Sequence, residues 1–108
     1  MDLDGFTKVA QVSSLSPGEM VAVEVEGDSV LIANVSGEVY AVSESCTHNG
    51  VSLVEGSLTD GFVECPLHTS LFSLYDGKVE PGYPAAEDLR TYKVRVEGND
   101  ILVGPPNQ

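Results

Sequence analysis

The chain has 108 residues, enough for one small domain, and its 16 valines against six alanines favour strands over helices. Seventeen acidic and five basic residues give a formal net charge of −12. This charge excludes nucleic acid and anionic membrane surfaces as partners and favours basic proteins.

Neither a signal peptide nor a membrane anchor is expected from the sequence. Residues 1–4 have no cationic start, and no apolar run follows them. The apolar run 30–33 is far below the roughly twenty residues that a membrane span requires. We therefore expect a cytoplasmic protein, in which structural disulfides are rare.

The first 45 residues predict an antiparallel meander that serves as a scaffold. Strands are expected over 6–12, 20–26, 29–35 and 38–42, with turns at 13–19, 27–28 and 36–37. In the second strand Val21, Val23 and Val25 alternate with Ala22, Glu24 and Glu26, so one face is expected to be buried. The 29–35 strand is more apolar and is expected to be more buried.

The middle of the chain carries both cysteines and both histidines, in the order Cys46, His48, Cys65, His68. Sixteen residues, 49–64, separate the two pairs. Residues 51–57 read as a connector, and Leu58 and Phe62 flank a hairpin signal at 59–61. Two loop tips presented side by side would bring the four donors together.

The last third predicts a strand over 71–74 with a hairpin at 76–77, then a proline-containing loop over 80–86. Alternating strands follow over 90–97 and 101–103, and Pro105-Pro106 is expected to end the fold. Three of the five basic residues lie in the 90–97 strand, where they are expected to offset carboxylates of a neighbouring strand.

The donor order restricts the kind of metal centre. Structural zinc sites usually pair ligands of one kind, whereas each pair here mixes a thiol with an imidazole, and the first pair has one spacer residue. A two-iron cluster with both cysteines on one iron and both histidines on the other removes this difficulty. A mononuclear zinc or iron site and a Cys46–Cys65 disulfide remain as alternatives.

In these residues the chain resembles the Rieske family. The likeness rests on Cys-x-His and Cys-x-x-His, on Pro66 after the second cysteine, on 70–72, and on Pro81-Gly82-Tyr83-Pro84. The chain looks most like the small soluble Rieske-type ferredoxins that serve bacterial aromatic-ring-hydroxylating dioxygenases. The resemblance implies an all-β, Rieske-like antiparallel β-sandwich. It also implies a single domain over 1–108 whose small cluster-binding subdomain, about 44–86, is formed by two hairpin loops.

The resemblance further implies one Rieske-type 2Fe-2S cluster. Cys46 and Cys65 would bind the buried iron, and His48 and His68 would bind the outer iron. The histidine tip would then be the port through which electrons pass. Because both histidines are used, no two-His-one-carboxylate iron site and no Ser-His-Asp site can be built, so no catalytic residues are expected.

The implied function is a monomeric one-electron shuttle, not an enzyme in itself. It would take electrons from a flavin-containing, NAD(P)H-dependent ferredoxin reductase and pass them to a terminal oxygenase. The alternatives are a small subunit of a larger oxidoreductase such as nitrite reductase, and a zinc-stabilised interaction module.

Side chains around the ligands predict a low reduction potential. High-potential relatives tie the two loops with a disulfide, but those positions hold Val51 and Leu67. Phe72 stands where such relatives have a tyrosine, while Ser70 matches the family's serine and Thr69 replaces a common glycine. Fewer hydrogen bonds to the sulfurs stabilise the reduced cluster less.

An acidic collar around the ligand tip is also expected. Four carboxylates lie near the ligand loops in sequence: Glu44, Glu55, Asp60 and Glu64. They would surround an apolar tip made of Pro66, Leu67 and Pro84 and steer a basic partner to it.

Overall fold

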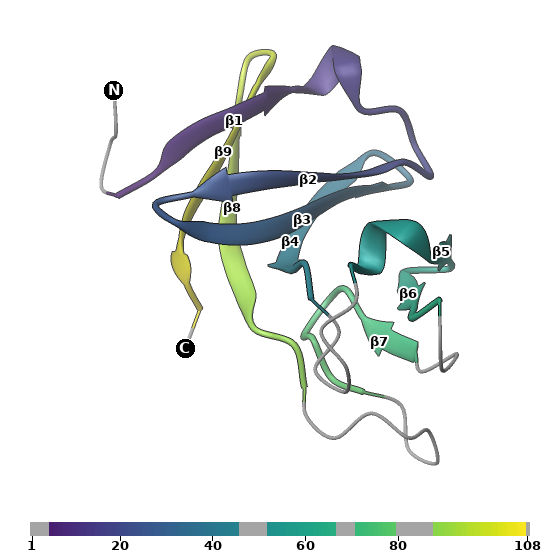
Figure 1. Ribbon diagram of the computed structural model, residues 1–108. Helices are drawn as coiled ribbons and strands as arrows, with labels where there is room; N and C mark the ends of the chain where they lie inside the picture. The colour runs from purple at the N-terminus through teal and green to yellow at the C-terminus, as the bar shows by residue number, and fades with distance from the viewer. Residues whose placement is uncertain (1–4, 46–51, 67–70, 80–87, 108) are drawn as a thin grey trace.

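The computed structural model describes residues 5–45, 52–66, 71–79 and 88–107, and within these ranges it is built from β-strands (Figure 1). Four strands precede the first ligand segment, and the last three of them form a meander. The elements are β1 (Thr7–Gln11), η1 (Val12–Ser14), β2 (Met20–Val25), β3 (Asp28–Val35), β4 (Glu38–Ser43), η2 (Leu53–Glu55), β5 (Ser57–Thr59), β6 (Phe62–Glu64), β7 (Leu71–Ser73), β8 (Thr91–Glu97) and β9 (Asp100–Pro106).

The strands form two antiparallel sheets. The large sheet has six strands in the order β1-β9-β8-β4-β3-β2, and the small sheet has three in the order β5-β6-β7. Because β4 and β8 are neighbours in the large sheet, the chain leaves at the end of β4, builds the small sheet and returns to pair at Ala41↔Tyr92. Figure 1 shows the small sheet on one side of the β2-β3-β4 meander. The all-β prediction is confirmed.

Tight turns set the register of the meander and of the small sheet. Residues 26–27, 36–37 and 60–61 each have two consecutive positive φ angles, which is the backbone of a type I′ hairpin turn. In each pair the second residue is a glycine, which adopts this conformation without strain. The turns at 36–37 and 59–61 were predicted, and the 27–28 turn is shifted back by one residue.

Burial in the meander follows the predicted alternation only in part. Val25 is buried and Val23 is half-buried, but Val21 is 41% exposed. β2 is an edge strand of the large sheet, so its Val21 end is not covered by a further strand. The prediction that 29–35 is more buried than 20–26 is confirmed, because residues 30–34 are all buried.

Two boundaries differ from the sequence prediction. Residues 51–57 were predicted to be a plain connector, but 53–55 form η2 and β5 starts at Ser57. The 101–103 strand continues to Pro106, so the prolines do not end the fold. They are tolerated because the β8–β9 ladder shifts register beside them, between Tyr92 and Val94, and because the β1–β9 pairs end at Thr7↔Val103.

The large sheet has a separate core on each face. Leu31, Ala33 and Val42 pack with residues of the small sheet and its connections, including Leu53, Cys65, Phe72 and Leu89. Val30, Ile32 and Ala41 face the other way and pack with Tyr92, Ile101 and Val103. One core therefore lies between the two sheets, and the other is formed by residues of the large sheet packing against one another on its other face.

Two tyrosines fasten the turn end of the small sheet to β4. The rings of Tyr40 and Tyr75 meet edge to face, with centroids 5.0 Å apart and an interplanar angle of 84°. Burial raises the pKa of Tyr40, and the charges of Glu38 and Tyr75 raise it further. The Tyr40 hydroxyl is therefore neutral at physiological pH.

No helix in the described ranges is long and apolar enough to cross a membrane.

Candidate metal centre

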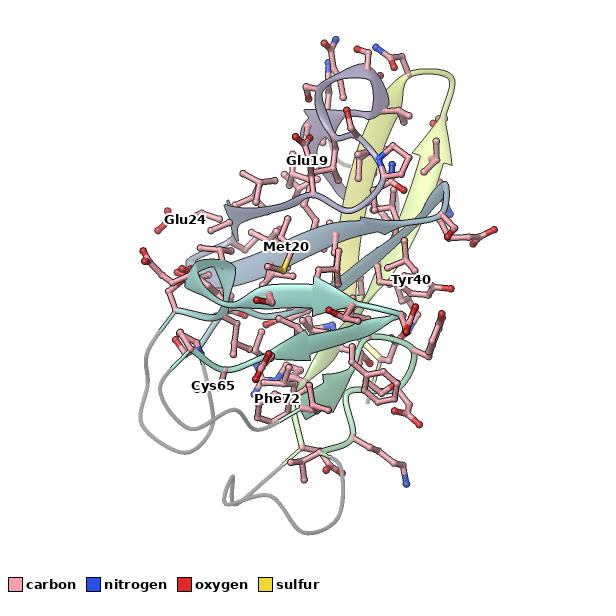
Figure 2. The ribbon with its side chains drawn as sticks, turned by 90° about the vertical axis from the view of Figure 1, so that its right-hand side faces the viewer. Glu19, Met20, Glu24, Tyr40, Cys65 and Phe72 are labelled. Carbon is pink, nitrogen blue, oxygen red and sulfur yellow. The ribbon has the colours of Figure 1, made fainter. Side chains whose placement is uncertain are left out.

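Cys65 is the one predicted ligand that lies in the described part of the chain. It follows the last residue of β6, it is fully buried, and it is a free cysteine. In Figure 2 it lies at one end of the small sheet, close to Phe72 and away from Tyr40. Cys46, His48 and His68 lie outside the described residues.

The first ligand segment starts and ends at one point. Ser45 and Ser52 form an antiparallel bridge, so residues 46–51 are the loop that this bridge closes. The Leu53 amide donates to the Glu44 carbonyl at 2.8 Å, and the Ser52 hydroxyl donates to the Glu44 carboxylate. The Glu44 amide in turn donates to Ser29 of β3 at 3.2 Å, which attaches the loop base to the large sheet.

The second ligand segment is closed in the same manner. Glu64 at the end of β6 pairs with Leu71 at the start of β7, so residues 65–70 connect two paired strands. Cys65 and His68 are therefore both carried by this one connection. Two separate hairpin-like closures, one for each ligand pair, agree with the sequence expectation of two loops.

The start of β5, which follows the first ligand segment, lies against the end of β6, which leads into the second. A shallow cavity of about 280 Å³ is lined by residues 55–57 on one side and 64–66 on the other. A Cβ built on Gly56 would lie 1.8 Å from the Glu64 carbonyl oxygen, so only glycine allows this approach. Leu53 and Cys65, one from each loop base, are both fully buried in the core between the sheets.

The described residues contain one of the four proposed metal ligands, Cys65. No group of three or more His, Cys, Asp or Glu side chains within those ranges is arranged to hold a metal ion. A buried thiol on an apolar core is a soft donor that is well placed for iron or zinc. The sequence places the other three proposed donors at 46–51 and 67–70.

One described neighbour of Cys65 in the core brings no side-chain hydrogen-bond donor. Phe72 is fully buried in the same core and carries no hydroxyl group. Ser70, Thr69, Val51 and Leu67 lie outside the described residues.

The acidic collar is smaller than expected. Glu55 is exposed, and Glu44 and Glu64 are half-buried beside the loop bases. Asp60, however, lies in the β5–β6 turn, at the opposite end of β6 from Cys65. Its place in the collar was wrong because the hairpin directs residues that are close in sequence to opposite ends of the small sheet.

Two of the three basic residues in the 90–97 segment lie close to carboxylates. Arg90 lies 3.9 Å from Asp28 of β3, and Arg95 lies 3.5 Å from Glu97 of its own strand. The Arg95 guanidinium also sits 4.4 Å from the centre of the Phe6 ring. The prediction named carboxylates of a neighbouring strand, but Arg90 lies near β3, which is not next to β8 in the sheet, and Arg95 pairs within β8.

Comparison with known proteins gives a match over most of the chain. The family model of the Rieske [2Fe-2S] domain matches residues 5–93. A curated relative, the ferredoxin component of biphenyl 2,3-dioxygenase from Rhodococcus jostii (strain RHA1), is 41% identical over 98 residues. That alignment covers 91% of this chain and 91% of the relative.

Solved structures agree with this match. The ferredoxin of carbazole 1,9a-dioxygenase from Nocardioides aromaticivorans IC177 superposes with a TM-score of 0.88 at 34% identity, covering 94% of this chain and 98% of that one. A chain in a complex of reduced oxygenase and oxidized ferredoxin of carbazole 1,9a-dioxygenase superposes with a TM-score of 0.86 at 28% identity. That superposition covers 94% of both chains.

Proposed function

The chain belongs to the Rieske [2Fe-2S] domain family, and from this membership we propose that it is the ferredoxin component of a bacterial aromatic-ring-hydroxylating dioxygenase system. The single observation that carries the proposal is likeness over the full length to stand-alone ferredoxins, with 91% of the biphenyl dioxygenase component and 98% of the carbazole dioxygenase ferredoxin covered. The chain is an electron-transfer component, and the oxygenation chemistry belongs to a partner.

The proposed ligands are Cys46 and Cys65 on the inner iron and His48 and His68 on the outer iron. Three findings support this set: Cys65 is a buried free cysteine, and each ligand pair is carried by a connection closed by strand pairing. When bound, a cluster of this kind gains and loses one electron at a time. The apolar core around Cys65 keeps water away from the inner side of the site.

The proposed cluster-binding part runs from about 44 to 86 within a single domain of residues 1–108. It contains the small sheet and both loop bases, and it is joined to the large sheet by one continuous core. The large sheet thus acts as a rigid support, and the ligands are placed on connections at its side.

We further propose two partners. The terminal oxygenase is the electron acceptor, as supported by the relative whose structure is a complex of oxygenase and ferredoxin. A flavin-containing, NAD(P)H-dependent ferredoxin reductase is the donor, since a cluster protein needs a partner that converts hydride to single electrons. Because NAD(P)H is an intracellular reductant, the proposed location is the cytoplasm, and the proposed state is a monomer that diffuses between partners.

Purification and reconstitution test the function. The protein is expected to be red-brown, to contain two irons and two acid-labile sulfides per chain as a Rieske cluster requires, and to give a Rieske EPR signal on reduction. The Cys65→Ser variant is expected to be purified without iron and without colour, whereas the wild-type protein retains both. A single zinc ion with no acid-labile sulfide would contradict the proposal.

A second experiment distinguishes a diffusing electron carrier from a permanent subunit of a larger enzyme. Size-exclusion chromatography of freshly lysed cells should give the chain at its monomer mass, and adding it to a dioxygenase reductase and oxygenase should restore NADH-dependent product formation. Stable co-elution with a large oxidoreductase would instead favour the alternative of a small subunit.

A further inference from the structure

Glu44 holds the base of the first ligand loop through three separate contacts. Its amide donates to the Ser29 carbonyl at 3.2 Å, and its carbonyl accepts from the Leu53 amide at 2.8 Å. Its carboxylate accepts a hydrogen bond from the Ser52 hydroxyl. Ser52 is the residue at which the loop closes, through its bridge with Ser45.

Only the third contact depends on the side chains at these positions. Any residue at 44 and 53 offers a backbone amide and carbonyl, but the third contact needs an acceptor at 44 and a hydroxyl at 52. Glu44 and Ser52 are both half-buried, so their bond is partly protected from competition by water. The pair therefore links the two ends of the loop in a manner that the backbone alone does not.

The Glu44 carboxylate also brings a negative charge to the cluster side of the molecule. It stands two positions before Cys46, and the loop base that it joins packs on the same core as Cys65. Adding an electron to a cluster makes it more negative, and a nearby fixed negative charge in a partly buried site opposes that addition.

We propose that Glu44 is a positioning residue for the first ligand loop, acting through Ser52, and that its charge lowers the reduction potential of the cluster. The inference rests on the proposed function, since it presumes a cluster held by Cys46 and Cys65. It concerns the loop base and not a partner surface, so it is tested on the isolated holoprotein.

Two substitutions separate the charge from the hydrogen bond. Glu44→Gln removes the charge and keeps an oxygen that accepts from Ser52. Ser52→Ala removes the hydrogen bond and keeps the charge. Glu38→Gln is the matched charge control, because Glu38 is exposed and begins β4 at the end opposite Glu44. Ser52→Thr is the conservative variant that keeps a hydroxyl.

Voltammetry of the holoproteins tests the charge. At a fixed electrode potential, Glu44→Gln is expected to raise the ratio of reduced to oxidised cluster at least about threefold, which is about 28 mV for a one-electron couple. Glu38→Gln is expected to produce less than half of that shift. Equal shifts in the two variants, or none in Glu44→Gln, would overturn the role of the charge.

Cluster loss during incubation with an iron chelator, followed by visible absorption, tests the positioning. Ser52→Ala is expected to lose its cluster at least about threefold faster than wild type, and Ser52→Thr at nearly the wild-type rate. A wild-type rate in Ser52→Ala would overturn the positioning role, as would an equally fast loss in Ser52→Thr. If the wild type itself binds no iron and no sulfide, the proposed function fails, which is a different result from either of these.

Discussion

At the residue scale, Cys65 is a buried thiol whose described neighbours in the core are apolar side chains. Phe72 fills the core beside it with carbon only, and Gly56, just before β5, comes close to the Glu64 backbone at the end of β6. We expect the first feature to favour a low reduction potential, and the second sets how closely the start of β5 approaches the end of β6. Each can be changed by one substitution.

The identity of residue 72 is expected to influence the reduction potential. For the wild type we expect a midpoint near the bottom of the Rieske range, roughly −150 mV. Phe72→Tyr should raise it by about 40 mV, equivalent to one net hydrogen bond of about 1 kcal/mol to a ligand sulfur in a one-electron couple. Voltammetry measures both values. Phe72→Leu, which adds no hydroxyl, is the control and should leave the midpoint near that of the wild type.

Gly56→Ala is expected to push the start of β5 away from the end of β6, next to Cys65. Its Cβ would lie 1.8 Å from the Glu64 carbonyl oxygen, so the backbone has to move, and we expect a loss of at least about 2 kcal/mol in the free energy of unfolding. Gly18→Ala is the control, because a Cβ there meets nothing within 4 Å and only its φ of +89° is unfavourable. Denaturant unfolding compares the two, and equal losses would contradict the argument.

At the scale of elements, the small sheet depends on the large one for its core. β5, β6 and β7 are three residues each, too short for a stable sheet of their own, and their buried side chains pack on β3 and β4. The opposite face of the large sheet is filled by its own strands. A substitution in the core between the two sheets should therefore affect the cluster more than an equally destabilising substitution in the opposite core.

Two valines allow this comparison with the same chemical change. Val42 faces the core between the sheets and Val30 faces the opposite core, and both are fully buried. Val42→Ala and Val30→Ala should each cost about 2 kcal/mol in unfolding free energy. Only Val42→Ala is expected to accelerate cluster loss to a chelator at temperatures where both variants are folded. Equal acceleration by both would show that the cores are not independent.

At the scale of the whole molecule, charge is the dominant property. A net charge of −12 on 108 residues creates a strong negative field, and the described basic side chains Arg90 and Arg95 are already close to carboxylates. Such a field accelerates encounter with a basic partner and does not require a large contact area. The carboxylates beside the loop bases direct that field to the cluster end of the molecule.

The rate at which a dioxygenase reductase reduces the protein is therefore expected to depend on salt. Raising the ionic strength from about 20 mM to about 500 mM should slow the second-order rate by about tenfold, because screening shortens the reach of the field. Stopped-flow absorption measures this rate. Glu55→Gln should weaken the salt dependence more than Asp60→Asn, since Asp60 lies at the other end of β6. A flat salt profile in the wild type would argue against steering.

Much of this protein is determined by local chemistry and was predicted from the sequence. Alternating apolar residues and glycine-containing turns specified the meander, because period-two burial and type I′ turns depend on neighbours along the chain. The order of two thiols and two imidazoles likewise indicated a two-iron cluster, since donor type and spacing are properties of the sequence itself.

Other features were decided only by the tertiary structure. The sequence did not show that β5 and η2 fill the region between the loops, that Asp60 points away from Cys65, or that β9 continues through its prolines. These depend on which strands lie side by side: the β1–β9 pairs stop at Thr7↔Val103, before Pro105, and such pairing of segments far apart in the chain is not written in the local sequence. The contact between Glu44 and Ser52 is of the same kind, because two residues eight positions apart meet only when the loop between them is closed.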